Sequence, residues 1–235
     1  MIVATTDFGE IKAVILTAGL GERLRPLTYL VPKPYLPLRN GLIIERILDW
    51  LKYQGLRYGD VIVVTAYMAD KVVSFLSNVL RDVKFVVADQ LLGTAGQLWY
   101  VRDYVNDGDD VVVINGDVLT NISLPKALEL HRSSGADVTI VSVRYKLTAR
   151  YGVLDIGPNG EFKGWREKPE ITLPIVTGIY VMRGFTIKWL GRERLDMNRY
   201  IERLVALGRR VMVYVDDGGY YVDLGVHSDY VSALL

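Results

Sequence analysis

The feature that most constrains the fold of this chain is a set of seven short runs rich in Val and Ile, separated by longer amphipathic stretches. The runs occupy residues 12–17, 60–65, 83–88, 110–115, 137–143, 175–182 and 210–215. Near-continuous apolar runs are typical of strands buried on both faces, and their alternation with helical stretches is typical of a parallel sheet covered by helices. The pattern therefore predicts a doubly wound α/β fold, a three-layer sandwich with a mostly parallel central sheet.

The stretches between the runs show helical periodicity. One helical face is predicted at Ile43, Ile44, Ile47, Leu48 and Leu51, and a second at Val72, Val73, Leu76, Val79 and Leu80. Ser123, with Pro125 just behind it, marks the start of another helix. The chain contains no repeat, low-complexity tract or Pro/Gly/Ser-rich linker, so we expect a single domain over residues 1–235.

Composition narrows the class of protein. Half of the residues are apolar, which allows a large core, and the formal net charge of +1 provides no overall field toward nucleic acid or an acidic membrane. Cysteine is absent, and the two histidines, His131 and His227, lie far apart, which excludes disulfides and a histidine metal cluster. No apolar run reaches the roughly 18 residues of a membrane span, and the first eleven residues do not resemble a secretory signal. We expect a cytoplasmic protein without nucleic-acid or membrane partners.

The stretch AGLGERLRPL, residues 18–27, follows the first predicted strand directly. Its two glycines allow backbone N–H groups to approach a ligand closely, and its two arginines can grip a phosphate. Taken alone, it also fits an ordinary turn between a strand and a helix. However, ligands of doubly wound folds gather beyond the carboxyl ends of the strands, which is where this loop lies. The motif G-x-x-x-x-G-K-[ST] is absent and Leu24 stands where a dinucleotide fingerprint has its third glycine, so the loop belongs to another class.

Residues 13–38, AVILTAGLGERLRPLTYLVPKPYLPL, resemble the opening motif LAAGxGTRLxPLTxxxPKPLxP of the sugar-1-phosphate nucleotidylyltransferases. Further blocks occur in the family's order: LLGTAGQL (91–98), VINGDVL (113–119), YGVLDIGPNGEFKGWREKPE (151–170), VTGIYVM (176–182) and YYVDLGVHSDY (220–230). The resemblance implies a Rossmann-like enzyme that joins a nucleoside triphosphate to a sugar 1-phosphate and releases pyrophosphate.

The resemblance also implies roles for individual residues on the nucleotide side. Ala18, Gly19 and Gly21 would form the nucleotide loop, and Arg23 and Lys33 would bind the triphosphate and the leaving pyrophosphate. Cancelling the repulsion between two anionic substrates is the main demand of this chemistry. The alternative interpretation of Arg23 and Lys33 is a pair of solvated surface cations. Gly93 and Thr94 would face the base, with Gln90 as a candidate base reader.

Two aspartates are the candidate metal ligands. Asp117 follows the run VVVIN and Asp223 lies in YYVDLG, each at a predicted strand end. Taken alone, each also fits a turn or a helix cap, but both align with the metal-binding aspartates of the family. Hard oxygen ligands together with a phosphate substrate favour Mg²⁺, the cofactor that the resemblance implies.

The remaining assignments concern the sugar phosphate. By resemblance, Lys168 of REKPE holds the phosphate of the sugar 1-phosphate, and Glu167 accepts hydrogen bonds from sugar hydroxyls. Gly152, Thr177 and Gly178 would line the sugar pocket. A solvated Glu–Lys surface pair is the alternative interpretation of residues 167 and 168.

The chain also departs from the family pattern. Glu22 replaces the usual Thr or Ser and is expected to point outward, while Arg25 is expected to have a structural role. Ala88 stands at the place of a common glutamine five residues before Gly93, so Gln90 is an uncertain base reader. We expect no C-terminal β-helix domain.

Substrate motifs favour dTTP or UTP with glucose 1-phosphate, because VTGIY and DLGVH are most like glucose-1-phosphate thymidylyltransferases. LGTAG is frequent in mannose-1-phosphate guanylyltransferases, which form the first alternative. Phosphocholine or inositol-phosphate cytidylyltransferases come next, followed by a noncatalytic regulatory subunit. The chain has all five charged residues that the family's chemistry requires, which argues against a noncatalytic subunit. They are Arg23, Lys33, Asp117, Lys168 and Asp223. A homo-oligomer is compatible with the sequence.

Overall fold

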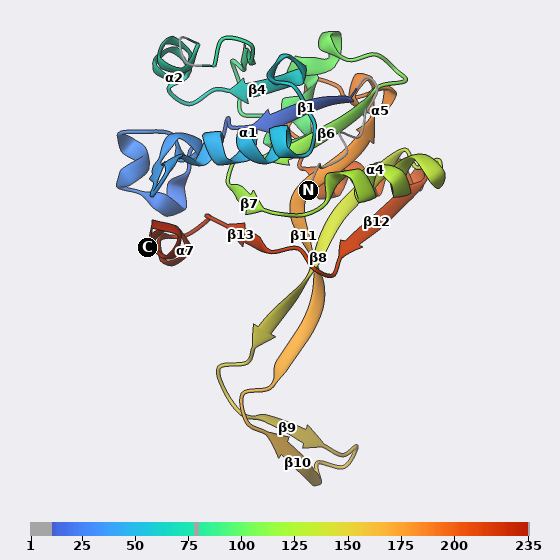
Figure 1. Ribbon diagram of the computed structural model, residues 1–235. Helices are drawn as coiled ribbons and strands as arrows, with labels where there is room; N and C mark the ends of the chain where they lie inside the picture. The colour runs from blue at the N-terminus through green and yellow to red at the C-terminus, as the bar shows by residue number, and fades with distance from the viewer. Residues whose placement is uncertain (1–10, 78–79, 235) are drawn as a thin grey trace, which may run out of the picture.

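A computed structural model describes residues 11–77 and 80–234 (Figure 1). Residues 1–10, on which the argument against a secretory signal depends, and Val79 of the second predicted helix lie outside these ranges. Seven strands form the main sheet in the order β12-β8-β11-β6-β1-β4-β5. Their bounds are Ile11–Leu16 (β1), Val61–Thr65 (β4), Lys84–Val87 (β5), Asp110–Asn115 (β6), Val138–Thr148 (β8), Glu170–Arg183 (β11) and Val211–Asp216 (β12).

The main sheet is mostly parallel. Strand β1 lies between β4 and β6 and runs parallel to both, while β12 runs parallel to β8. Strand β11 is antiparallel to both of its neighbours, β6 and β8. Each of the seven apolar runs forms one of these strands, so the predicted doubly wound α/β architecture is confirmed.

Helices cover both faces of the sheet because successive strand residues are buried on opposite sides. Ile11, Ala13 and Ile15 pack in one core, whereas Val14 and Leu16 pack in the other. The first core is covered by α1 (Ile43–Tyr53), α2 (Ala69–Leu76), α4 (Leu124–Ser133) and α7 (His227–Leu234). The second is covered by α3 (Gly93–Gly96), the 3₁₀ segment η5 (Gln97–Tyr104), α5 (Gly184–Lys188) and α6 (Met197–Ala206).

Short elements complete the fold. Strand β7 (Val118–Thr120) pairs antiparallel with β13 (Tyr221–Asp223), and β2 (Pro37–Leu38) pairs with β3 (Gly41–Leu42). Single 3₁₀ turns occupy Glu22–Leu24 (η1), Leu27–Tyr29 (η2), Lys33–Tyr35 (η3) and Tyr58–Asp60 (η4). The pair β7–β13 brings the C-terminal part of the chain to the end of β6. In the described part of the chain, no helix is long and apolar enough to cross a membrane.

Two strands are longer than the apolar runs predict. Strand β8 continues beyond residue 143 to Thr148, and β11 begins at Glu170 instead of residue 175. Beyond them, β9 (Val153–Ile156) and β10 (Phe162–Arg166) form a hairpin that projects from the body with the extended strands (Figure 1). We call residues 144–176 the arm. Its strands alternate exposed apolar and polar side chains, so they lack the continuous apolar run that marks a strand buried in the sheet.

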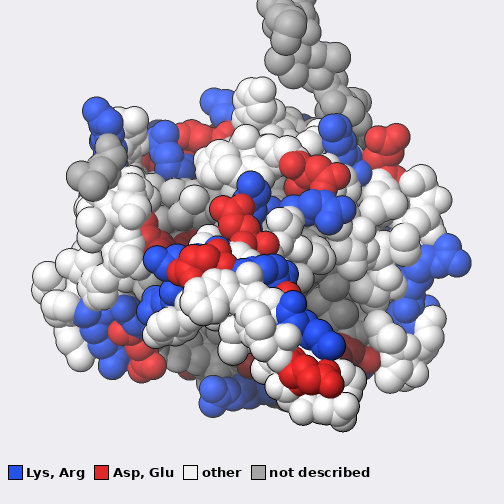
Figure 2. Space-filling model, turned by 90° about the horizontal axis from the view of Figure 1, so that it is seen from below, with Lys and Arg blue, Asp and Glu red and all other residues white. Residues whose placement is uncertain are grey.

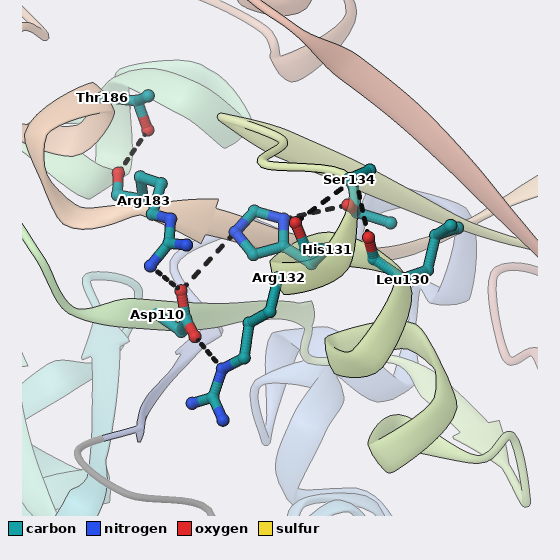
Figure 3. Close-up of polar contacts among 8 residues, drawn as sticks. Asp110, Leu130, His131, Arg132, Ser134, Arg183 and Thr186 are labelled. Carbon is teal, nitrogen blue, oxygen red and sulfur yellow. Dashed lines mark hydrogen bonds and ion pairs between the residues drawn. The ribbon is translucent and has the colours of Figure 1, made fainter.

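A charged cluster anchors α4 beside the amino-terminal end of β6 (Figure 3). Asp110, 3% exposed, lies 2.6 Å from Arg132 Nε, 2.7 Å from Arg183 Nη1 and 3.6 Å from His131 Nε2. Burial alone would raise the pKa of Asp110, but the nearby His131, the hydrogen bond from Arg132 and the charges of the two arginines hold this pKa below its usual value. His131 is fully buried, and its Nδ1 bonds Thr139 Oγ1 at 2.9 Å. This histidine therefore serves packing at the end of β6 that is opposite to the glycine loop.

Candidate functional site

A cavity of about 900 Å³ opens where β1 and β6 end side by side. Its walls come from the glycine loop after β1, the start of η3, the residues after β6, helix α3 and the segment before α6. Of the residues predicted from sequence, the lining includes Ala18, Gly19, Gly21, Arg23, Lys33, Gly93, Thr94 and Asp117. The carboxyl ends of parallel strands are where ligands of such sheets gather. The structure therefore brings most of the predicted nucleotide-side residues together.

The glycine loop presents its backbone to this cavity. A Cβ at Gly19 would meet no atom within 4 Å, so the space beside this residue is open. In the part of the chain that the structure describes, the N–H groups of residues 18–20 donate to no protein acceptor. Gly21 has a φ of 62°, and Thr28 Oγ1 donates to its carbonyl at 2.9 Å. Free N–H groups on a loop of fixed shape are suited to an anion such as a phosphate.

Asp117 and Asp223 lie together although 106 positions separate them (223 minus 117). Strand β13 pairs with β7 so that Asp223 lies opposite Val118, and Leu224 N donates to Asp117 O at 3.1 Å. Both carboxylates contact the ammonium of Lys33, which is 2.5 Å from Asp117 Oδ2 and 3.8 Å from Asp223 Oδ1. The small sheet β7–β13 therefore assembles a two-carboxylate centre around one lysine.

Lys33 is held at this centre by its local fold. It begins η3 between two prolines, and the residue as a whole is 8% exposed. Its side chain thus lies against the aspartates instead of extending freely into the cavity. This placement makes Lys33 a counter-charge for the carboxylates as well as a wall of the cavity.

The electrostatics of the centre leave Asp223 short of positive charge. Burial and the nearby Asp117 raise the pKa of the Asp223 carboxyl, and Lys33 and Arg23 offset this only in part. Asp223 Oδ1 is buried and accepts no hydrogen bond from the described residues. A buried carboxylate oxygen without a donor is costly unless another group satisfies it. A further cation bound beside Asp223 would therefore stabilise the ionised carboxylates of the centre.

Arg23 reaches the same centre across Gly225. A Cβ at Gly225 would lie 2.9 Å from Asp223 Oδ1 and 3.0 Å from Arg23 Nη2, so a larger residue here would push the two charged groups apart. The following segment is tied to the glycine loop, because His227 Nε2 donates to Arg25 O at 2.8 Å. These contacts explain why the block DLGVH belongs to the site although only its aspartate was assigned from sequence.

Glu22 lies at the rim of the cavity. Its side chain is 64% exposed, and its Oε1 accepts a hydrogen bond from Arg25 Nη2 at 3.1 Å. The arginine also stacks over the ring of Tyr29, 5.1 Å from its centre. This exposure agrees with the expected outward direction of Glu22, and the contacts of Arg25 agree with a structural role.

The far wall of the cavity contains residues that sequence reasoning missed. Gly93, with a φ of 76°, lies so close to the start of α6 that a Cβ would be 2.6 Å from Asp196 Oδ1. Thr94 Oγ1 accepts a hydrogen bond from Met197 N at 2.8 Å. Arg194, Asp196, Gln97 and Asn115 also line the cavity, and none of them was assigned a role from sequence. Asn115 could have been found from its place before Gly116 and Asp117, whereas Arg194 and Asp196 carry no signal beyond a helix start.

The remaining predicted substrate residues lie outside this cavity lining. Gly152, Glu167 and Lys168 are exposed on the arm, with Glu167 Oε2 3.1 Å from the place of a Gly152 Cβ. Thr177 is fully buried at the root of the arm, where its hydroxyl donates to Val141 O at 2.8 Å, and Gly178 lies against Asn115. Gln90 is exposed beside α3. Their roles in sugar or base binding stay predictions.

The carboxylate centre fits a magnesium ion. Mg²⁺ in phosphate-transfer sites is commonly held by one or two carboxylates together with substrate phosphates and waters. Asp117 and Asp223 offer two such carboxylates, and Asp223 Oδ1 accepts no hydrogen bond from the described residues. Among the described residues, no group of three or more His, Cys, Asp or Glu could hold a metal ion by itself. The two carboxylates would therefore need further oxygen ligands, from substrate phosphates and waters, to complete the coordination of a magnesium ion.

Comparisons with known proteins agree with this geometry. The sequence profile described as nucleotidyl transferase matches residues 12–235. The chain is 30% identical over 244 residues to the UTP–glucose-1-phosphate uridylyltransferase of Synechocystis, covering 95% of this chain and 62% of that protein. It is 29% identical over 234 residues to mannose-1-phosphate guanylyltransferase 1 of Arabidopsis thaliana, covering 95% of this chain and 63% of that protein. The chain thus spans about three fifths of the length of these relatives.

A solved structure shows the same fold. The crystal structure of HddC from Yersinia pseudotuberculosis, complexed with GMP-PN, superposes with a TM-score of 0.73. It is 25% identical in sequence, and the match covers 95% of this chain and 97% of that one. The likeness extends over nearly the whole chain.

Proposed function

The chain belongs to the nucleotidyl transferase family, and we propose that it transfers a nucleotidyl group from a nucleoside triphosphate to a sugar 1-phosphate. The products would be a nucleotide sugar and pyrophosphate. The observation that carries the proposal is the cavity at the ends of β1 and β6, which is lined both by a glycine loop with free N–H groups and by Lys33 and Asp117 of the centre that also contains Asp223. Anion binding and cation binding meet there, as a reaction between two phosphates requires.

The residues of this chain would act by binding and positioning. The N–H groups of residues 18–20 and the guanidinium of Arg23 would bind the triphosphate, which neutralises charge and orients the α-phosphorus for in-line attack. Lys33 would hold the two aspartates and stabilise charge on the leaving pyrophosphate. Asp117 and Asp223 would hold Mg²⁺, which supplies electrostatic stabilisation of phosphate oxygens when bound. The mechanism needs no covalent intermediate on the protein.

Arm residues would bind the second substrate. Lys168 would contact the phosphate of the sugar 1-phosphate, and Glu167, with Gly152 beside it, would accept hydrogen bonds from sugar hydroxyls. These assignments depend on the resemblance of REKPE to the family motif. They predict that Lys168→Ala harms the use of sugar phosphate and leaves nucleotide affinity little changed.

For the substrate pair we propose dTTP or UTP with glucose 1-phosphate. The Synechocystis relative, named for UTP and glucose 1-phosphate, supports this choice. A second candidate is GTP with mannose 1-phosphate, which the Arabidopsis relative and the GMP-PN complex of HddC favour. Both candidates use the same centre and differ in the base and sugar contacts.

A substrate matrix tests the function. The purified protein is mixed with Mg²⁺, each nucleoside triphosphate in turn, and glucose 1-phosphate or mannose 1-phosphate, and released pyrophosphate is measured together with the nucleotide sugar. We expect release that depends on both substrates and is lost in Asp117→Asn. Absence of release with every sugar phosphate would reject the function. Release with phosphocholine or an inositol phosphate as acceptor would reassign the second substrate.

A further inference from the structure

The far wall of the cavity consists of residues from two segments, 91–97 and 194–196. Backbone hydrogen bonds tie these segments together. Leu195 N donates to a carbonyl of the first segment at 2.7 Å, and Leu195 O accepts from two N–H groups of α3 at 3.0 Å each. A Cβ at Gly96 would collide with the carbonyl oxygen of Glu193, so the two backbones are in direct contact. The position of the far wall is therefore fixed by the fold.

The second segment and the residues before it carry unpaired charges into the cavity. Four of these residues are charged: Arg192, Glu193, Arg194 and Asp196. The first two form ion pairs, with Asp89 and with Arg203 respectively, and lie outside the cavity lining. In the described part of the chain, the side chains of Arg194 and Asp196 have no hydrogen-bond or ion-pair partner, and both residues line the cavity. A donor and an acceptor are thus left available on this wall.

The local backbone places the two side chains side by side. Leu195 is 5% exposed and packs in the second core, whereas its two neighbours are exposed. Asp196 has an extended backbone, with a φ of −88° and a ψ of 153°. On an extended backbone, residues two apart face the same side with their Cα atoms about 7 Å apart. Arg194 and Asp196 can therefore reach one edge of a flat ligand together.

The other polar side chains of the far wall are already engaged. Thr94 Oγ1 accepts a hydrogen bond from a backbone N–H of α6 at 2.8 Å. Gln97 is 5% exposed, its Oε1 is buried, and its Nε2 donates to Gln90 O at 3.4 Å. Gln90, the candidate base reader from sequence, lies outside the cavity lining. Among the described residues, Arg194 and Asp196 are therefore the polar side chains of this wall that are both exposed and unpaired.

The far wall is where the base of a nucleotide would lie. Most of the remaining lining belongs to the glycine loop and to the centre around Lys33 and Asp117, which would bind the triphosphate. All nucleoside triphosphates carry the same phosphates. Basic and acidic groups are interspersed on the face seen in Figure 2, and the net charge is +1, so no broad field sorts one nucleotide from another. Selection among nucleotides must therefore come from contacts to the base.

We propose that Arg194 and Asp196 read the base and select keto bases, namely guanine, uracil and thymine. The inference rests on the proposed function, which supplies the nucleoside triphosphate. These bases carry a carbonyl oxygen, to which Arg194 donates, beside a ring N–H, from which Asp196 accepts. Adenine and cytosine present an amino group and an unprotonated ring nitrogen at the same places, so donor would face donor and acceptor would face acceptor. Both candidate substrate pairs contain a keto base.

Equilibrium binding tests the selection without enzyme activity. Calorimetry in the presence of Mg²⁺ compares GTP with ATP and UTP with CTP, because each comparison keeps the ring size, and inorganic tripolyphosphate gives the affinity without a base. In the ring size that binds better, the keto nucleotide should bind at least about tenfold more tightly than the amino nucleotide. Equal affinities within both comparisons would overturn the proposal.

Two variants assign the selection to these side chains. Arg194→Leu and Asp196→Ala should each bring the keto and amino nucleotides to within about threefold of each other, while the affinity for tripolyphosphate changes by less than about twofold. Arg199→Leu is the matched control, because Arg199 forms an exposed pair with Glu202 on α6 outside the cavity lining, and it should keep the wild-type preference. If Arg194→Leu weakens tripolyphosphate as strongly as the nucleotide, the guanidinium binds phosphate and the base assignment is wrong.

Steady-state rates separate base reading from the proposed function. Both variants should raise KM for the keto nucleotide about tenfold and leave kcat within about twofold, because a base contact is the same in the ground state and in the transition state. A protein that prefers keto nucleotides in calorimetry but releases no pyrophosphate with any sugar phosphate would support base reading and reject the function. Pyrophosphate release that is equally fast with ATP, CTP, GTP and UTP would support the function and overturn base reading.

Discussion

Lys33→Met is the most informative single change, because one ammonium serves both aspartates of the centre. Methionine keeps the length and apolar stem of lysine and removes the charge. The ammonium is 2.5 Å from Asp117 Oδ2, and the side chains of Lys33 and Asp117 are 10% and 24% exposed. Without it, two neighbouring carboxylates face each other with Arg23 as the remaining nearby cation. The folded state should therefore lose stability at neutral pH.

The size of the loss follows from the burial of the pair. Removing one partner of a buried ion pair costs about 3–5 kcal/mol, whereas an exposed pair contributes about 0–1 kcal/mol. The Lys33–Asp117 pair is nearer the buried limit, but Asp223 is 42% exposed. We expect a loss of about 2 kcal/mol, which lowers the unfolding midpoint of a chain of this length by about 4–8 °C.

The pH dependence gives the loss a signature. Without the ammonium, the pKa of Asp223, which is already raised, rises further, so its ionised form destabilises the fold more strongly. This part of the loss should be present at neutral pH and vanish as the pH falls below 3.8, the value of an unperturbed Asp, because the carboxyl of Asp223 is then protonated in both the folded and the unfolded state. Asp117→Asn in the Lys33→Met background should recover most of the stability at neutral pH. Mg²⁺ should raise the midpoint of Lys33→Met more than an equal ionic strength of KCl.

Thermal unfolding followed by circular dichroism measures these effects. Lys188→Met is the matched control, since it makes the same substitution at an ion pair with Asp107 whose side chains are 41% and 73% exposed. Its midpoint should fall by no more than about 2–4 °C, the equivalent of about 1 kcal/mol. If Lys33→Met unfolds within about 1 °C of the wild type at neutral pH, the central counter-charge role of Lys33 is wrong.

Three further predictions concern the same site. Asp223→Asn should raise the unfolding midpoint at neutral pH, because the raised pKa of Asp223 makes its ionised form a cost; the gain should disappear below pH 3.8, and calorimetry that finds no gain at neutral pH contradicts the burial argument. Asp117→Ala and Asp223→Ala should each lower kcat by about a hundredfold or more, and the double variant little further, in steady-state rates across a Mg²⁺ titration with circular dichroism as the folding control. Near-normal activity of either single variant at limiting Mg²⁺ rejects a shared site. Glu22→Thr should change kcat/KM for the nucleotide by less than about tenfold, because the carboxylate is exposed and paired with Arg25; a much larger gain means that it reaches the phosphates.

Sequence reasoning found many of the residues that line the cavity, because they lie just beyond strand ends. Gly19, Gly21 and Asp117 come within four residues of the end of an apolar run, and a parallel sheet places the carboxyl ends of its strands on one side. Sequence reasoning did not identify Arg194 and Asp196, because they line the cavity only as a result of the packing of the start of α6 against Gly93. Sequence reasoning also underestimated the length of the arm strands, because their alternating apolar and polar side chains form no continuous apolar run.

The sequence by itself determined the local elements: seven strands, their alternation with helices, and a glycine loop after the first strand. Burial on two faces demands apolar residues at every position of a strand, and that demand is visible within a few residues. Tertiary structure alone decided that β13 pairs with β7, and hence that Asp223 meets Asp117 and that Lys33 lies between them. It also decided that Lys168 lies on the arm, where the β9–β10 hairpin meets β11, and outside the lining of the cavity. Contacts between segments a hundred residues apart depend on which strand edges pair, and no local pattern records that choice.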